Sequence, residues 1–322
     1  MSTSVVTSAG ARRAVTTATV DMYQRDGGIM TATSDRPLVV GIDEAPQSQL
    51  ALRWAIEEAR SRGCPLHIVS VYELTTRPLE YELVSQLGAQ STLRDRFDEA
   101  VAFAFERLGA DRVSHAYVAG HPAQVLLNEA ASAAALVVGS TSRSPAAAVL
   151  IGSVSGAVAA HARCPVVVVR AAPAGPAAGP VVVGMDSSPH SDQAARVAFE
   201  QAHGRGLPLK VVHCSSPLPG YADPGKSPGG ILADEPDGRE RWIEERLAPL
   251  RKDHPDVRVS LHLVEGRPAD ELIACSAHAT IVVVGSRGHG GIGGLLLGSV
   301  SQALLHHARC TVIVAKDVLS PR

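Results

Sequence analysis

Gly285–Leu305, GSRGHGGIGGLLLGSVSQALL, is the stretch that decides the fold. It directly follows Thr280–Val284, TIVVV, a short β-branched run that predicts a buried parallel strand, and it runs into a helical pattern that begins near Ser299. The order is therefore strand, glycine loop and helix. Glycines let backbone N–H groups come close to a ligand, and the free N–H groups at a helix N-terminus favour negative charge. The stretch predicts a phosphate site.

The spacing of the glycines is more specific than their number. Gly285, Gly288 and Gly298 stand at G-x2-G-x9-G, and Ser299 follows directly as a helix N-cap or as a phosphate donor. Glycines that only form a tight turn are the alternative. That interpretation is weaker, because so many glycines are costly unless something approaches the backbone.

Two better-known phosphate motifs are excluded. Gly288, Gly290 and Gly293 satisfy G-x-G-x-x-G, but the dinucleotide motif needs an acidic residue roughly 20 positions further on, to hold ribose. That region is Thr311–Ala315, an apolar strand. A Walker A loop ends in Gly-Lys-Ser/Thr, and Gly298 is followed directly by serine with no lysine between them.

The glycine spacing, together with the aspartate that ends VVVGMD (Val181–Asp186), resembles the ATP-binding subclass of the universal stress protein family. The resemblance implies Rossmann-like, adenine nucleotide alpha hydrolase-like α/β domains with strand order 3-2-1-4-5, and it implies bound ATP, with or without Mg²⁺. It also implies that Asp186 lies by the adenosine and that Gly285, Gly288, Gly298 and Ser299 hold ribose and phosphates. Asp186 could instead cap the next helix.

Several basic residues lie near this motif. Arg287 and His289 could add positive charge to the phosphates or could be solvated loop residues. His161 and His307 lie near predicted helix C-termini, where a cation suits the helix dipole, so a structural role is favoured over a catalytic one.

Length and composition bound the class of protein. The chain has 322 residues, 45% hydrophobic and 19% charged, which is enough for two cores of ordinary size. A formal charge of −2 and an aromatic content of 3% argue against nucleic acid as a partner. No apolar run approaches the roughly 18 residues needed to span a bilayer, and we expect no membrane association and a cytoplasmic location. The 5 cysteines form no C-x2-C pair, so neither a metal site nor a disulfide framework is predicted.

The first half alternates between strands and helices. Residues 1–36 lack periodicity and are interpreted as a disordered extension, in which Met30 could be the true start. The predicted elements that follow are Pro37–Asp43, Ser48–Arg62, Pro65–Val71, Ser91–Leu108, Val113–Ala119, a helix opening at Pro122, Ala135–Gly139, Ser153–Ala162 and Pro165–Arg170. This alternation predicts a five-stranded parallel sheet with helices on both faces.

The pattern then repeats. Residues 172–179 form an Ala/Pro/Gly linker between a first domain, 37–171, and a second domain, 180–317. Asp186 stands 143 residues after Asp43, and Gly285 stands 146 residues after Gly139. The extra residues fall in Ser215–Gly238, which predicts a long loop.

The two copies differ at the glycine loop. The first copy reads GSTSRSPAAAVLIGS from Gly139 to Ser153, with Ser142 at the position of Gly288. Asp43, Gly139, Gly152 and Ser153 remain there as nucleotide-binding candidates, but side chains and a proline make a phosphate-binding loop harder to form. We therefore expect an intact site in the second copy and a degraded one in the first.

No nucleophile, base and orienting group converge by spacing, so no catalytic residue is predicted. The first hypothesis is an ATP-binding regulator that is not an enzyme and whose regulatory protein partner is unknown. The rival is a nucleotide-using enzyme of the adenylate-forming or phosphotransfer class. The apolar final strands Val166–Val169 and Val312–Val314 should be covered, either by each other in a pseudo-twofold pair or in a homodimer.

Overall fold

The computed structural model describes residues 36–72, 80–140, 151–170, 178–215, 236–288 and 297–316, with side chains from 93 in the second range and from 238 in the fifth. These ranges leave out residues 1–35, 171–177 of the linker region, 216–235, for which a loop is predicted, Ser142 and His289. Within the described part of the chain, no helix is long and apolar enough to cross a membrane.

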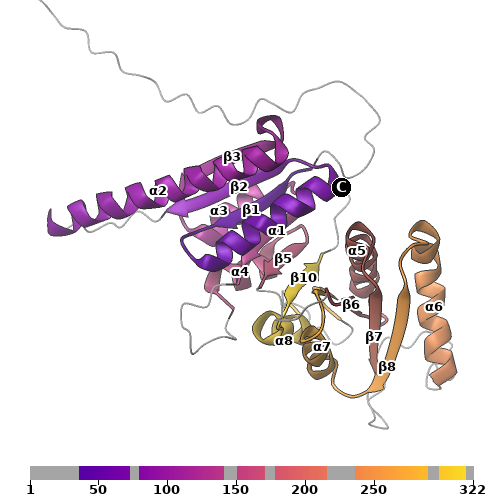
Figure 1. Cartoon of the computed structure of the whole chain (residues 1–322). Helices are drawn as coiled ribbons and strands as arrows, with labels where there is room; N and C mark the ends of the chain where they lie inside the picture. The colour runs from indigo at the N-terminus through magenta and orange to yellow at the C-terminus, as the bar shows by residue number, and fades with distance from the viewer. Residues whose placement is uncertain are drawn as a thin grey trace, which may run out of the picture. The chain divides into compact units, whose positions relative to one another are not determined.

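The strands and helices alternate through both halves (Figure 1). The first half contains β1 (Leu38–Ile42), α1 (Pro46–Arg62), β2 (Leu66–Tyr72), α2 (Glu80–Leu108), a 3-10 turn (Ala110–Arg112), β3 (Val113–Ala119), α3 (Pro122–Glu129), β4 (Ala135–Gly139), α4 (Ser153–His161) and β5 (Val166–Val169). The second half contains β6 (Val181–Gly184), α5 (Pro189–Arg205), β7 (Leu209–Ser215), α6 (Pro236–Asp253), β8 (Val259–Glu265), α7 (Pro268–Ser276), β9 (Ile281–Gly285), α8 (Ser299–His307) and β10 (Thr311–Ala315).

Each half forms the predicted parallel sheet. The strand order is β3-β2-β1-β4-β5 in the first half and β10-β9-β6-β7-β8 in the second, within one 10-stranded sheet. Both halves therefore have the order 3-2-1-4-5 that the resemblance implied. The predicted helix at Ser91 is wrong at its start, because α2 begins at Glu80; the preceding Glu, Leu and Gln residues have high helix propensity and extend it.

The two final strands cover each other, as predicted. β5 and β10 pair antiparallel, with Val168 opposite Val312, Val167 opposite Ile313 and Val166 opposite Val314. Val167 and Ile313 are equivalent residues in the duplication, so the register is symmetric about this pair. A pseudo-twofold axis between the halves passes through it. Pairing removes two apolar strand edges that would otherwise be open to association.

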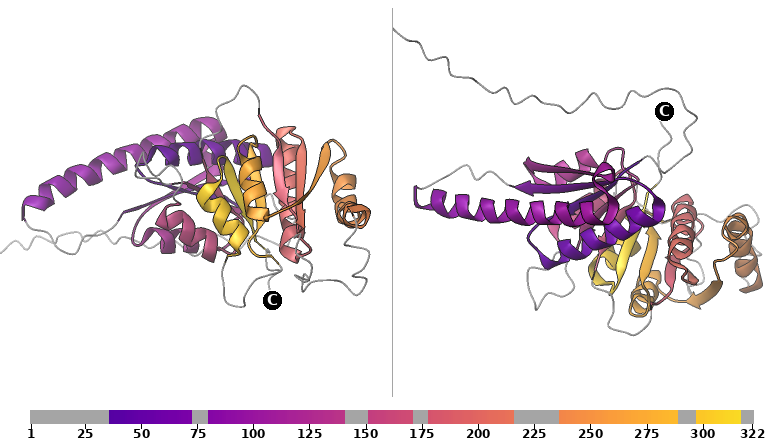
Figure 2. Two further views of the ribbon diagram at one scale, coloured as in Figure 1. Left: turned by 90° about the horizontal axis from the view of Figure 1, so that it is seen from below. Right: turned by 45° about the horizontal axis from the view of Figure 1, so that its top comes forward.

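The helices cover both faces of the sheet. Figure 2 shows α1 and α2 side by side on one face of the first sheet, with α3 and α4 on the other. Alternate strand residues follow this division, since Leu38 and Val40 pack with α1 and α2 whereas Val39 packs with α3 and α4. Both hydrophobic clusters continue across β5 and β10 into the second half. The sheet thus carries one core layer on each face through both copies.

Candidate functional site

The strand order places a crevice in each half. β1 pairs in parallel with β2 on one side and with β4 on the other, so the order in which strands are added to the sheet reverses between β1 and β4. Ligands of open α/β sheets bind outside the carboxyl ends of strands at such a switch point. Asp43 follows β1, and Gly139 ends β4. In the second half, Asp186 and Gly285 take the same positions after β6 and at the end of β9.

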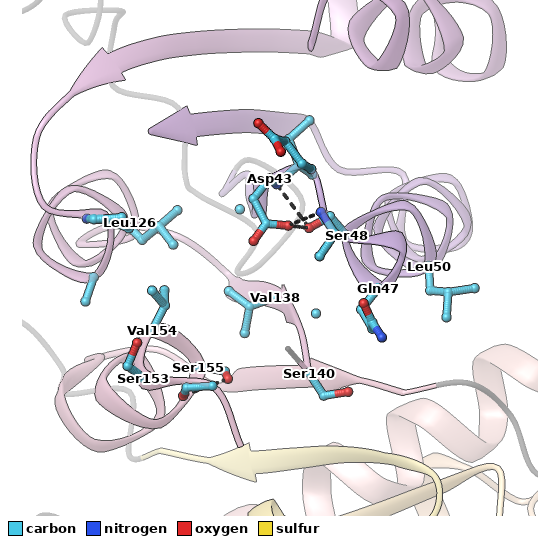
Figure 3. Close-up of a pocket in the computed structure, with 18 of the residues that line it drawn as sticks. Asp43, Gln47, Ser48, Leu50, Leu126, Val138, Ser140, Ser153, Val154 and Ser155 are labelled. Carbon is cyan, nitrogen blue, oxygen red and sulfur yellow. Dashed lines mark hydrogen bonds between the residues drawn. The ribbon is translucent and has the colours of Figure 1, made fainter. Parts of the chain in front are cut away.

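A cleft of about 2260 Å³ lies at this point in the first half. It contains all four nucleotide-binding candidates of that copy, Asp43, Gly139, Gly152 and Ser153. Figure 3 shows Asp43 and Ser48 on one side of the cleft and the start of α4, with Ser153, Val154 and Ser155, on the other. The structure therefore brings together the residues that the sequence analysis selected for the degraded site.

Asp43 is exposed and organises the start of α1. Its Oδ1 accepts a hydrogen bond from the backbone N–H of Ala45 at 3.0 Å and another from the Ser48 hydroxyl. The backbone N–H of Asp43 in turn donates to the Ser48 Oγ at 3.0 Å (Figure 3). This small network fixes the strand-to-helix turn that forms one wall of the cleft.

Asp186 has the position in the second half that Asp43 has in the first, but its second carboxylate oxygen, Oδ2, has a different environment. Its Oδ1 accepts hydrogen bonds from the backbone N–H of Ser188 at 2.9 Å and from the Ser188 hydroxyl at 2.5 Å. Ser188, not Asp186, is the N-cap of α5, because its Oγ accepts from the N–H of Ser191 at 3.2 Å. Asp186 thus positions the capping residue. Its Oδ2 faces Gly288, where an added Cβ would lie 2.5 Å from that oxygen.

The strand-end glycines have a packing role in both copies. A Cβ on Gly285 would lie 2.8 Å from the backbone carbonyl oxygen of His190, in the first turn of α5. A Cβ on Gly139 would lie 2.8 Å from the carbonyl oxygen of Gln47, in the first turn of α1. These glycines let a helix N-terminus approach the strand end, which is a requirement of the fold independent of any ligand.

Gly298 closes the second loop onto its strand. Its N–H donates to the Ser286 carbonyl at 2.8 Å, and it is the N-cap of α8 with φ −76° and ψ 161°. Ser299 is the first helical residue and is exposed, so the alternative that it serves as the N-cap is not adopted. A Cβ on Gly298 would lie 3.4 Å from the Cα of Arg287, an ordinary contact. The described residues therefore leave room for a side chain at this position.

Two basic residues near the loops, one buried and one half-buried, were not selected from the sequence. Lys316 directly follows β10, and its Nζ donates to the carbonyl of Ala160 in α4 at 3.2 Å. Its duplicate, Arg170, follows β5 and donates to the carbonyl of Leu305 in α8. Burial, reinforced by the nearby charge of Arg287, lowers the pKa of Lys316 to about 8. The signal in the sequence was a basic residue at the end of each final strand.

The cleft of the first half is also lined by residues that the spacing of the sequence motifs does not assign to it. Tyr72 and Tyr117, whose rings stack at a centroid distance of 4.8 Å, line it. His307 and Arg309, which belong to the second copy, line it as well. Pairing of β5 with β10 brings the two halves together, so this cross-copy contribution depends on tertiary structure. Arg287 is exposed at the second site, and His289 lies outside the described residues.

Comparisons with known proteins agree with the duplication. The model of the universal stress protein family matches residues 36–170 and again 178–316. The chain is 38% identical over 289 residues to universal stress protein Rv2005c of Mycobacterium tuberculosis, covering 87% of this chain and 97% of that protein. It is 33% identical over 299 residues to universal stress protein Rv2623 of the same species, covering 90% and 99%.

A solved structure agrees with the fold. The crystal structure of a universal stress protein from Archaeoglobus fulgidus DSM 4304 is similar with a TM-score of 0.62, at 19% identity, over 87% of this chain and 98% of that one. At this identity the similarity concerns the fold alone. The match extends over both halves, as the symmetric sheet requires.

Proposed function

The chain belongs to the universal stress protein family, and we propose that it binds ATP in its second domain and acts as a nucleotide-dependent stress-response regulator rather than as a metabolic enzyme. The domains in this proposal are residues 37–171 and 180–317, joined by the linker 172–179 and preceded by an extension, 1–36. Asp186 would lie by the adenosine, and the glycine loop would hold ribose and phosphates.

The observation that carries this proposal is the geometry around Gly298. This glycine has a φ that any residue adopts, and among the described residues no close neighbour excludes a side chain, so this part of the fold does not require it. It lies at the N-terminus of α8, where backbone N–H groups outside the helix ladder favour a phosphate. Gly288 lies next to it in space, and Asp186 faces Gly288 across the switch point. A ligand that passes close to Gly298 accounts for the absence of a Cβ.

The first domain is proposed as a second, weaker site. Asp43, Gly139, Gly152 and Ser153 line its cleft, and Tyr72 and Tyr117 offer aromatic surface to a base. Its loop has Ser142 where the second copy has Gly288. Backbone hydrogen bonds to a charged phosphate contribute roughly 1.5 to 3 kcal/mol each, so the loss of one or two weakens binding by about 10 to 1,000-fold or more.

Calorimetry on matched variants tests the assignment. We expect about one tight ATP per chain, and we expect Gly298→Ala to abolish that binding while its duplicate, Gly152→Ala, leaves it nearly intact. Because the described residues leave room for a Cβ at Gly298, an unchanged melting temperature in Gly298→Ala would show that the loss comes from the ligand contact. Two equally tight sites, or loss of tight binding in Gly152→Ala alone, would contradict the assignment to the second domain.

A turnover assay separates a regulator from an enzyme. The protein is incubated with excess ATP and Mg²⁺, and we expect no multiple turnovers and no release of AMP and pyrophosphate; either result would favour an adenylate-forming or phosphotransfer enzyme. A regulator needs ATP to bind two conformations with different affinities.

The remaining parts of the proposal concern location and partners. We place the protein in the cytoplasm, without nucleic acid or membrane as a partner. β5 and β10 are used within the chain, so a homodimer would require a different surface. Size-exclusion chromatography with light scattering distinguishes a monomer from a dimer, and cell fractionation tests the location.

A further inference from the structure

A second group of chemically active side chains lies away from both switch points, on the outer part of the second domain. The Nδ1 or Nε2 of His262, a carboxylate oxygen of Glu271 and the Sγ of Cys275 all lie within 4.8 Å of one another, and all three residues are half-buried. His262 comes from the edge strand β8, whereas Glu271 and Cys275 come from α7, which follows β8 through a short connection (Figure 1). Glu271 and Cys275 are four residues apart and therefore share one face of the helix.

These three side chains line a cavity. A small cavity of about 260 Å³ lies between α7 and the strands β6, β7 and β8. Its lining residues are Pro180, Val182, Lys210, His262, Glu271, Ala274, Cys275 and His278. A second imidazole, His278, thus reaches the same cavity. A second thiol, Cys214 of β7, is close enough to interact electrostatically with Glu271 and Cys275. The three possible ligand atoms therefore border a cavity, and a second imidazole and a second thiol lie beside them.

We propose that His262, Glu271 and Cys275 form a zinc-binding site. An imidazole nitrogen, a thiolate sulfur and a carboxylate oxygen are the ligand types that Zn²⁺ takes, whereas Mg²⁺ and Ca²⁺ require oxygen ligands. Ligand atoms of a tetrahedral zinc centre are about 3 to 4 Å apart, given metal–ligand distances of roughly 2.0 to 2.3 Å. The three ligand atoms, which lie within 4.8 Å of one another, would have to approach by about 1 Å to reach that geometry. His278 or water takes the fourth position.

The first domain supplies an internal contrast. By the duplication, Ala116 stands where His262 stands, Val125 where Glu271 stands and Glu129 where Cys275 stands. Glu129 there pairs with His67 of β2, with 3.3 Å between Nε2 and the carboxylate oxygen. The first copy therefore has a two-residue contact between an imidazole and a carboxylate on the same face of its sheet, and it lacks the thiol. One zinc per chain is the expected stoichiometry. The sequence analysis predicted no metal site, because its ligands come from a strand and a helix without a recognised spacing.

The experiment uses the full chain, stripped with a chelator and kept reduced, and then titrated with Zn²⁺ by calorimetry and with Co²⁺ by absorption spectroscopy. We expect one Zn²⁺ per chain and a cobalt–thiolate charge-transfer band. Cys275→Ser should remove the band, and His262→Ala should weaken zinc binding by roughly 100-fold or more. Glu129→Gln, in the equivalent position of the first domain, should leave both signals unchanged.

Thermal unfolding distinguishes a variant that has lost zinc binding from one that does not fold. Zn²⁺ should raise the melting temperature of the wild-type protein and of Glu129→Gln, and it should leave that of Cys275→Ser unchanged, with the zinc-free Cys275→Ser protein melting close to the zinc-free wild type. Absence of zinc uptake would overturn the proposal. So would a cobalt band that persists in Cys275→Ser, or one that disappears only in Cys214→Ser, since the ligand set would then be a different one.

Discussion

Replacement of Glu58 by glutamine is expected to destabilise the junction between the two domains. Glu58 of α1 is 3% exposed. It accepts hydrogen bonds from Arg62 at 2.5 Å, from Gln201 at 2.5 Å and from Arg205 at 2.7 Å, the last two across the junction from α5. Burial alone would raise the pKa of this carboxyl, but the charges of Arg62 and Arg205 outweigh it and hold the pKa below its usual value.

The magnitude follows from the exposure of the partners. Breaking a buried ion pair by removing one partner costs about 3 to 5 kcal/mol, because the remaining charge is left uncompensated. The side chains of Arg62 and Arg205 are 32% and 22% exposed, so water compensates part of their charge and the lower end applies. We therefore expect Glu58→Gln to lose about 3 kcal/mol of unfolding free energy. In a chain of this size that loss lowers the melting temperature by about 4 to 6 °C.

The assay is thermal unfolding followed by circular dichroism at neutral pH, with Glu57→Gln as the matched control. Glu57 is the preceding residue of the same helix and pairs with Arg60, but these side chains are 55% and 64% exposed. Its removal should cost no more than about 0.5 kcal/mol. Because the pKa of Glu58 is lowered on folding, its contribution is present above the unfolded value near 4.5 and is lost as the pH falls below it. Equal melting temperatures for the two variants would refute the reasoning.

Three further predictions concern the second loop and the chain's N-terminus. Lys316→Met should raise the melting temperature at pH 7, because a lysine whose pKa falls to about 8 on folding costs stability below pH 8. The difference in melting temperature from the wild type should shrink as the pH rises from 8 toward 10.5. Gly285→Ala should lower the free energy of unfolding by about 1 to 3 kcal/mol, and with it the urea midpoint, because the new Cβ would meet the His190 backbone. Gly298→Ala should leave the midpoint unchanged. Deletion of residues 1–35, which lack apolar periodicity, should leave the melting temperature within about 1 °C of the full chain, and a drop of several degrees would show that the extension packs.

The sequence predicted the fold through signals that are local in the chain. Valine runs such as Val181–Gly184 and the recurring apolar spacing of α1 identify strands and helices without reference to the rest of the molecule. The pairing of β5 with β10 followed from the need to cover two apolar edge strands, and the symmetric register of Val167 and Ile313 confirms it. The order of strands within each half came from the family resemblance.

The residues that the sequence did not reveal depend on contacts between the copies. Glu58 and Gln201 are duplicates of each other, as are Arg62 and Arg205, and only their meeting near the pseudo-twofold axis makes one carboxylate face two arginines. In the sequence, Glu58 is an ordinary residue of an amphipathic helix. Lys316 is hidden for the same reason, since its partner Ala160 belongs to the other copy. His262 is an exception, because its partners come from the next helix of the same copy but at no recognised spacing.

The glycines shared by the two copies do not carry equal weight as evidence for a nucleotide. Gly139 and Gly285 are both required by the close approach of a helix N-terminus, so the presence of Gly139 in the first copy says nothing about binding there. A Cβ at Gly288 would force the Asp186 carboxylate to shift, and the first copy, which has Ser142 at this position, has Asp43 exposed instead. Gly298 has neither requirement among the described residues, and its φ of −76° is one that any residue adopts. The case for a bound phosphate therefore rests on Gly298, which is why the proposed calorimetry compares it with Gly152.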